Sequence, residues 1–354
     1  MKGLLAAMIL AAQPAPAPDD AEALMADVLA ETGVPAAALI VVGPDGPIVQ
    51  ETEGLRAAGG EAPVRPGDAW HIGSNAKAMT ATLALVLAQD SVIDLDDTVT
   101  EVLGEAYRVH EDWSAVTLRS LLGHRGGVQP NAGRLTMARG ILLGAKTEAA
   151  APKDRRRVLK GLLKKPPQGE VGAYDYSNLG YTLAGEMLQA AAGEPFEALI
   201  RARLFAPLGM EGVVFGAPQA PGGAISGHWG EAPDWEPADI DNPLFMSPAG
   251  TLAFPPDAYA AFLTDQLRGQ MGLDALLPTE AYEAMASAPE GGTYGLGWGV
   301  REDGTLGHSG SNTAWMATAI LAPQEGRAAA VIVNAGKVPP LAPFAEAALA
   351  LGAD

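Results

Sequence analysis

The sequence predicts an α+β fold: an antiparallel β-sheet flanked by helices and built from both chain termini, with an all-helical region inserted between its strands. Apolar, β-branched runs separated by short Gly-, Pro- and Asp-containing turns occur near the start of the chain and again near its end. Between them, apolar residues recur at helical spacing. Because sequential strands joined by short turns pair antiparallel, the two stranded ends predict one sheet that the helices cover.

Two helices and a β-hairpin are expected in the first 90 residues. Residues 21–32 form a predicted helix, which a Gly-Val-Pro segment ends. The apolar run 38–42, a Pro-Asp-Gly turn and a second run from Ile48 predict the hairpin. Residues 74–90 carry apolar side chains at helical spacing, so a second helix is expected there.

The rest of the chain is expected to be helical first and stranded afterwards. Residues 117–206 show a helical pattern broken by Gly and Pro loops. Segments separated by turn signals then predict strands at 294–300, 305–309, 315–321 and 328–334. Residues 342–351 predict a closing helix.

The chain is expected to divide into a short leader and one domain. One Lys, an apolar stretch and a Pro-rich break make residues 1–17 a predicted signal peptide and leader, which implies a periplasmic or secreted protein. If this segment is not a signal, the protein is cytoplasmic. No later segment offers about 18 uninterrupted apolar residues, so no stable membrane insertion is expected after signal removal. Residues 18–354 form the expected catalytic domain, with 18–92 and about 226–354 as its α/β part and about 93–225 as its mainly helical part.

Composition narrows the classes of function. Of 354 residues, 42 are Asp or Glu and 23 are Lys or Arg, which gives a formal net charge of −19. Such a chain repels phosphate backbones, so no nucleic-acid partner is expected. The sequence has no cysteine and its histidines are scattered without metal-ligand spacing, so we expect no metal and no cofactor. The basic run in 149–165 predicts a solvated helix face or, alternatively, a patch for an anionic ligand near the cleft.

Gly73-Ser74-Asn75-Ala76-Lys77 is the first candidate for chemistry. Ser74 and Lys77 stand three residues apart at the start of a predicted helix, so their side chains share one face. The N–H groups and positive potential of a helix N-terminus stabilise a developing alkoxide. A desolvated lysine can act as the base for such a serine. A capping serine beside an exposed lysine is the alternative explanation.

Tyr176-Ser177-Asn178 is the second candidate. A tyrosine near cations, with its pKa lowered by them, exchanges a proton with the nucleophile or the leaving group. Asn178 can donate to a substrate carbonyl and accept from Lys77. A loop with a packed tyrosine is the alternative explanation for this segment alone. His124 is expected to tie down a turn rather than to take part in catalysis.

The third candidate is the end of a predicted strand, His308-Ser309-Gly310-Ser311. Gly310 would let a substrate backbone approach this strand closely. The N–H of Ser311 could then pair with the N–H of Ser74 as an oxyanion hole.

These three segments occur in the order typical of the serine β-lactamase and penicillin-binding-protein superfamily. The chain most resembles the branch of class C β-lactamases, DD-peptidases and β-lactamase-fold esterases. Pro207-Leu208-Gly209-Met210 matches a signature of that branch. The resemblance runs from about Ala21 to the last helix and implies a β-lactamase/transpeptidase-like fold.

The resemblance also implies roles for the candidate residues. Ser74 would be the acylated nucleophile, Lys77 its activating partner and Tyr176 the general base and acid. The implied substrate-binding residues are Asn178, His308, Ser309 and Gly310. His308 replaces the lysine that the third motif carries in class C β-lactamases. Because histidine is mostly neutral near pH 7, it would hold a substrate carboxylate weakly, which argues against efficient β-lactam hydrolysis.

We therefore expect a metal-free serine hydrolase that cleaves an ester or amide through an acyl-enzyme on Ser74. Carboxylesterase-like activity is the leading expectation. A D-amino-acid peptidase, a DD-carboxypeptidase or a weak β-lactamase is the alternative, and a non-catalytic homologue that binds cell-wall peptide is a second one. The expected partner is a small-molecule ester, an amide or a cell-wall peptide.

Overall fold

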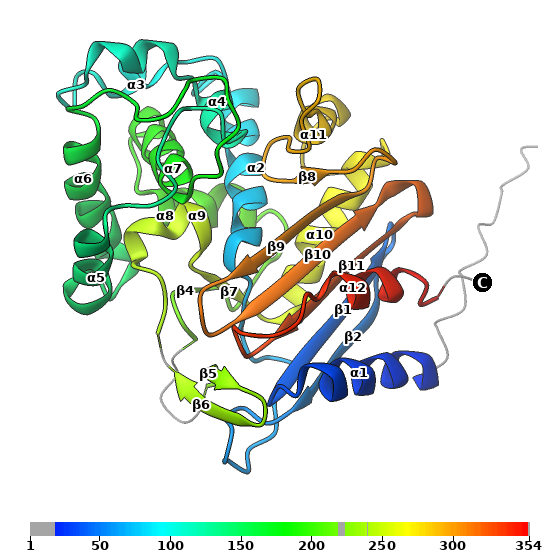
Figure 1. Ribbon diagram of the computed structural model, residues 1–354. Coiled ribbons are helices and arrows are strands. Elements are labelled where there is room, and N and C mark those ends of the chain that lie inside the picture. Colours follow the sequence, from blue (N-terminus) through cyan, green and yellow to red (C-terminus); the bar gives the residue numbers. More distant parts are fainter. Residues whose placement is uncertain (1–17, 219–223, 239, 353–354) are drawn as a thin grey trace, which may run out of the picture.

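The computed structural model of the protein describes residues 18–218, 224–238 and 240–352 (Figure 1). The predicted signal peptide at residues 1–17 lies outside the described residues. The α-helices are α1 (Pro18–Thr32), α2 (Ala76–Gln89), α3 (Val99–Leu103), α4 (Leu118–Leu122), α5 (Arg134–Leu143), α6 (Ala151–Leu162), α7 (Asn178–Ala192), α8 (Phe196–Ile200), α9 (Ser247–Gly250), α10 (Pro256–Gln270), α11 (Thr279–Ala286) and α12 (Ala342–Leu349). The strands are β1 (Ala36–Gly43), β2 (Gly46–Gly54), β3 (Trp70–His71), β4 (Val214–Phe215), β5 (Gly227–Glu231), β6 (Asp234–Ala238), β7 (Leu252–Phe254), β8 (Gly299–Val300), β9 (Leu306–Ser311), β10 (Met316–Ala322) and β11 (Arg327–Val333).

The main sheet joins strands from both ends of the chain, as predicted. Its six strands run in the order β2-β1-β11-β10-β9-β8, and every neighbouring pair is antiparallel. β1 forms a hairpin with β2 and pairs on its other side with β11, so that Ala37 lies opposite Val333. The predicted α+β class with an antiparallel sheet is therefore confirmed.

Helices cover both faces of the sheet, which explains why β1 is apolar throughout and β11 is apolar after Arg327. In β1, Leu39 and Val41 pack into a core with α1 and α12, whereas Ile40 and Val42 pack into the larger core on the opposite face. Figure 1 shows α1 and α12 together on one face. Every residue of β1 and β11 is buried.

The helices α3 to α8 form the region inserted between the strands and lie beside one end of the sheet (Figure 1). α2 contacts α7 of this region and α9, so it connects the helical region to the sheet. Within the described residues, no helix is long and apolar enough to cross a membrane.

Three parts of the structure differ from the expectations. The strand expected at 294–300 shortens to β8, because Gly297 turns the chain with φ of +81° and packs against α2, where a Cβ would lie 2.6 Å from Ala78 Cα. The β5–β6 hairpin and the small sheet β3-β7-β4 were not predicted. The basic helix α6 is not solvated all round, since Arg155 is fully buried between two glutamates.

Candidate active site

Ser74 lies in a 3₁₀ turn, Gly73–Asn75, directly before α2, and not within the helix itself as predicted. Gly73 adopts φ of +53°, a left-handed conformation that glycine accommodates readily. A Cβ on Gly73 would lie 2.4 Å from the backbone nitrogen of Ser311. The glycine therefore allows both the turn and its close contact with the end of β9.

Lys77 reaches back from the first turn of α2 to Ser74, as the three-residue spacing predicts. Its Nζ lies 2.9 Å from Ser74 Oγ, 2.7 Å from Asn178 Oδ1 and 2.7 Å from the carbonyl oxygen of Ala249. The side chain is fully buried. Burial lowers the pKa of Lys77 well below its ordinary value, because the charged form loses its hydration. The alternative of an exposed lysine is therefore wrong.

The second segment supplies the start of α7. Ser177 caps this helix, since its hydroxyl accepts from the N–H of Gly180 at 2.8 Å. The cap fixes Asn178 at the first helical position, where its Oδ1 accepts from Lys77, as predicted. Its Nδ2 donates to Asn131 Oδ1 at 2.9 Å.

Tyr176 lies against both Ser74 and Lys77, but its acidity differs from the expectation. The Lys77 Nζ is 4.9 Å from the centre of the tyrosine ring. Burial nevertheless raises the pKa of Tyr176 to about 12, and the hydrogen bond with Ser74 offsets this only in part. The prediction of a lowered pKa is therefore wrong, because desolvation outweighs the lowering by the hydrogen bond with Ser74.

The end of β9 packs directly on the turn that carries Ser74. A Cβ on Gly310 would lie 2.4 Å from the Ser74 nitrogen, so only glycine permits this contact. Ser74, Asn178 and Ser311 line one cavity of about 480 Å³. The structure thus places Ser74, Asn178 and Ser311 around one cavity, where the turn of Ser74 and the end of β9 are in contact.

His308 and Ser309 line a further cavity of about 790 Å³, and the His308 ring also lies 6.3 Å from the ring of Tyr176, centre to centre. The His308 Nδ1 bonds to the carbonyl oxygen of Ser309 at 2.8 Å, and its Nε2 bonds to the Tyr294 hydroxyl at 3.1 Å. Burial lowers the pKa of His308 to about 3, with a further contribution from Lys77. The ring is therefore neutral at physiological pH, as expected. The Ser309 hydroxyl bonds to Thr318 across the sheet at 2.9 Å.

His124 ties down the loop before α7, as expected. Its Nδ1 accepts from the N–H of Ser177 at 3.0 Å, and its carbonyl accepts from Asp175 at 2.8 Å. The ring lies 4.3 Å from the ring of Tyr176, centre to centre. Burial lowers the pKa of His124 to about 2, so this packed ring carries no charge.

A hydrogen-bond network next to the turn of Ser74 was not predicted from the sequence. Nδ1 of the fully buried His71 accepts from the N–H of Gly73 at 3.1 Å, and its Nε2 lies 3.0 Å from Asp241 Oδ2. Asp241 Oδ1 accepts from Asn312 Nδ2 at 2.8 Å. One carboxylate therefore joins the turn of Ser74, through His71, to Asn312, the residue after β9. Nothing in the local sequence around Asp241 signals this, since His71 is 170 positions away.

The described part of the chain contains no group of three or more His, Asp or Glu side chains placed to hold a metal ion. A family model described as Beta-lactamase matches residues 21–354 of the chain. The protein belongs to the Beta-lactamase family. This confirms the predicted family.

Curated relatives match part of the chain. Penicillin-binding protein 4 of Amycolatopsis lactamdurans is 30% identical over 184 residues, which are 51% of this chain and 44% of that protein. The match to the curated relatives thus spans less than half of their length.

Solved structures support the fold over a longer stretch. A D-stereospecific amidohydrolase from Streptomyces sp. superposes with a TM-score of 0.69 at 22% identity, covering 93% of this chain and 97% of that one. A class C β-lactamase superposes with a TM-score of 0.75 at 17% identity, covering 94% and 95%. At these identities the likeness shows the shared fold.

Proposed function

We propose that this protein hydrolyses esters or amides through an acyl-enzyme on Ser74, with carboxylesterase-like activity foremost. The observation that carries the proposal is the buried contact of 2.9 Å between Lys77 Nζ and Ser74 Oγ. A serine hydroxyl is a weak nucleophile until an adjacent base takes its proton, and this contact supplies such a base.

The partners of Lys77 are compatible with its neutral form. The carbonyl oxygens of Asn178 and Ala249 only accept hydrogen bonds, whereas the Ser74 hydroxyl can donate or accept. A neutral amine has two N–H bonds and one lone pair, which match two acceptors and one donor. The pKa of Lys77, lowered by burial, supports the same state. Lys77 is thus prepared to accept the proton of Ser74.

The proposed reaction has two steps. Ser74 Oγ attacks the carbonyl carbon while its proton passes to Lys77, and the N–H groups of Ser74 and Ser311 hold the resulting oxyanion. The tetrahedral intermediate then expels the alcohol or amine, which takes the proton from Lys77, directly or relayed through the Tyr176 hydroxyl. In the second step water attacks the acyl-enzyme and gives a proton to Lys77 by the same path. Lys77 returns this proton to Ser74 Oγ as the acid leaves. With its pKa at about 12, Tyr176 is better suited to donate a proton than to act as a base.

The neutral His308 supports uncharged esters as the first substrates to test. Lysine at this position would offer a permanent cation beside β9, whereas a histidine with its pKa at about 3 offers none. The second candidate substrate is an amide or peptide of a D-amino acid. The similarity in fold to a D-stereospecific amidohydrolase supports this candidate.

The test is the initial rate with p-nitrophenyl butyrate and with a D-alanine p-nitroanilide, for the wild type beside Ser74→Ala and Ser311→Ala. We expect Ser74→Ala to abolish activity. Ser311→Ala should retain most of it, because the proposed role of Ser311 uses the backbone N–H. The intact mass of the wild type, quenched during turnover, should rise by one acyl group. Activity that survives in Ser74→Ala would refute the assignment, and inactivity of the wild type on both substrates would favour a non-catalytic peptide-binding protein.

We also propose that the protein is exported to the periplasm or secreted after removal of a signal peptide that lies within residues 1–17, because the sequence pattern there is typical of one. The mass of the mature protein recovered from the exported fraction of the producing cells tests this. A protein that keeps Met1 and stays in the cytoplasm would contradict it.

A further inference from the structure

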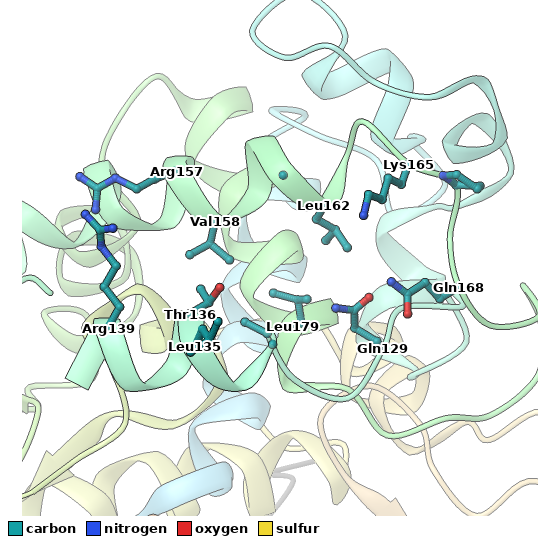
Figure 2. A pocket seen from close by; sticks show the side chains of 14 residues that line it. Gln129, Leu135, Thr136, Arg139, Arg157, Val158, Leu162, Lys165, Gln168 and Leu179 are labelled. Carbon is teal, nitrogen blue, oxygen red and sulfur yellow. The ribbon is translucent and has the colours of Figure 1, made fainter. Parts of the chain in front are cut away.

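A second cavity lies next to the candidate active site, between α5 and α6 (Figure 2). Its volume is about 490 Å³. Leu135, Leu162 and Leu179 provide apolar wall. Figure 2 shows the guanidinium groups of Arg139 and Arg157 turned toward each other at one end of this cavity. We call it the α5–α6 pocket.

The charge of the α5–α6 pocket is opposite to that of the protein. The chain carries a formal net charge of −19, yet Arg139, Arg157 and Lys165 line this pocket and no acidic residue does. Arg157 forms an ion pair with Asp154 outside the lining, at 2.6 Å, whereas the described part of the chain offers Arg139 no acidic partner. Two facing guanidinium groups repel each other, and an anion between them would relieve that repulsion.

The α5–α6 pocket adjoins the cavity of the candidate nucleophile. Ala132 lines both cavities. Leu179, in the wall of the α5–α6 pocket, directly follows Asn178, which contacts Lys77 in the other cavity. A chain attached to a carbonyl at Ser74 can therefore pass Ala132 and extend along the apolar wall toward the two arginines.

We propose that the α5–α6 pocket binds the distal carboxylate of an extended substrate whose scissile bond lies at Ser74. The substrate class is an ester or amide of a dicarboxylic acid, with an apolar chain between its two ends. This inference rests on the proposed hydrolase function. It assigns the recognition of the distal carboxylate to the α5–α6 pocket; His308 on β9 is neutral, and Arg134 lines the cavity of Ser74 itself.

The test compares p-nitrophenyl hydrogen suberate with its ω-methyl ester, which has the same scissile bond and no negative charge. The wild type should prefer the acid in kcat/KM. Arg139→Gln and Arg157→Gln should each reduce kcat/KM for the acid by about fivefold, as expected for a partly exposed ion pair, and leave the methyl ester unchanged. Lys160→Gln, on an exposed position of the same helix, is the matched control and should affect neither substrate.

The outcomes separate this proposal from the proposed function. If the wild type turns over both esters without preferring the acid, the proposed role of the α5–α6 pocket is wrong and the proposed hydrolase function stands. The same conclusion follows if the arginine variants lose equal kcat/KM on both esters. If neither ester is turned over, calorimetric titration of Ser74→Ala with monomethyl suberate and with dimethyl suberate decides the question. Tighter binding of the acid, lost in the added Arg139→Gln, supports the pocket; equal or absent binding of both refutes it.

Discussion

Replacing Arg155 by Met should cost a large part of the protein's stability. The side chain extends from α6 and is fully buried, with Nη1 at 2.8 Å from Glu197 Oε1 and Nε at 3.2 Å from Glu186 Oε2. Both glutamates are nearly buried, at 3% and 4% exposed. Met fills much of the volume but leaves two carboxylates in the interior without a cation. Breaking a buried ion pair in this way costs about 3–5 kcal/mol, a large share of the roughly 5–15 kcal/mol that stabilises a typical domain.

Urea denaturation followed by far-ultraviolet circular dichroism measures this loss. We expect Arg155→Met to lower the free energy of unfolding by about 4 kcal/mol with an unchanged m-value. Lys160→Met, at an exposed position of the same helix, should change it by less than about 0.5 kcal/mol. Adding Glu186→Gln and Glu197→Gln to Arg155→Met should restore most of the loss, because no buried charge then remains. A loss below about 1 kcal/mol, or a triple variant no more stable than the single one, would refute the reasoning.

Three further predictions concern the candidate site. Gly310→Ala places a Cβ 2.4 Å from the Ser74 nitrogen and should reduce kcat/KM for p-nitrophenyl butyrate at least tenfold, whereas Gly307→Ala, whose nearest neighbour would lie at 3.4 Å, should retain activity. Similar rates for the two variants would contradict the contact. Lys77→Arg keeps a cation that never releases its proton, so kcat should fall by about 10²–10⁴, and a loss under tenfold would exclude Lys77 as the base. The unfolded chain takes up a proton at His308 near pH 6.5, but the folded protein only near pH 3, so the free energy of unfolding should fall as pH is lowered between these values. In His308→Gln this fall between pH 6.5 and 4.5 should be smaller by about 2 kcal/mol in urea titrations, and identical slopes would contradict the buried neutral ring.

The local sequence pattern was sufficient to predict the sheet and its covering helices, because both faces of β1 and β11 are buried and these strands are apolar apart from Arg327. It was insufficient where long-range partners decide the conformation. β3 and β4 are two residues long and exist because β7 pairs with both of them. The bend at Gly297 likewise depends on its contact with α2, and no residue near Gly297 in the sequence indicates that contact.

In the candidate site, too, contacts set by local spacing were predicted, and features set by distant residues were not. The three-residue spacing of Ser74 and Lys77 predicted their contact, since a helical turn fixes it. The sign of the pKa shift of Tyr176 was predicted wrongly, because burial is a property of the whole fold and no short motif encodes it. Asp241 was missed for a related reason, as its partner His71 is remote in sequence.

The pairing of β1 with β11 also has a consequence for how the protein folds. The N–H of Ala36 meets Asn334 Oδ1 across 298 positions of the chain, and contacts of such separation form slowly, because a very long loop must close first. Until then β1, with every residue apolar or Gly, lacks its second neighbour and is prone to aggregate. Ser74 and Ser311 become neighbours only when the turn before α2 meets β9, which belongs to that same sheet. Activity regained during refolding would therefore report closure of the sheet, well after the helices have formed.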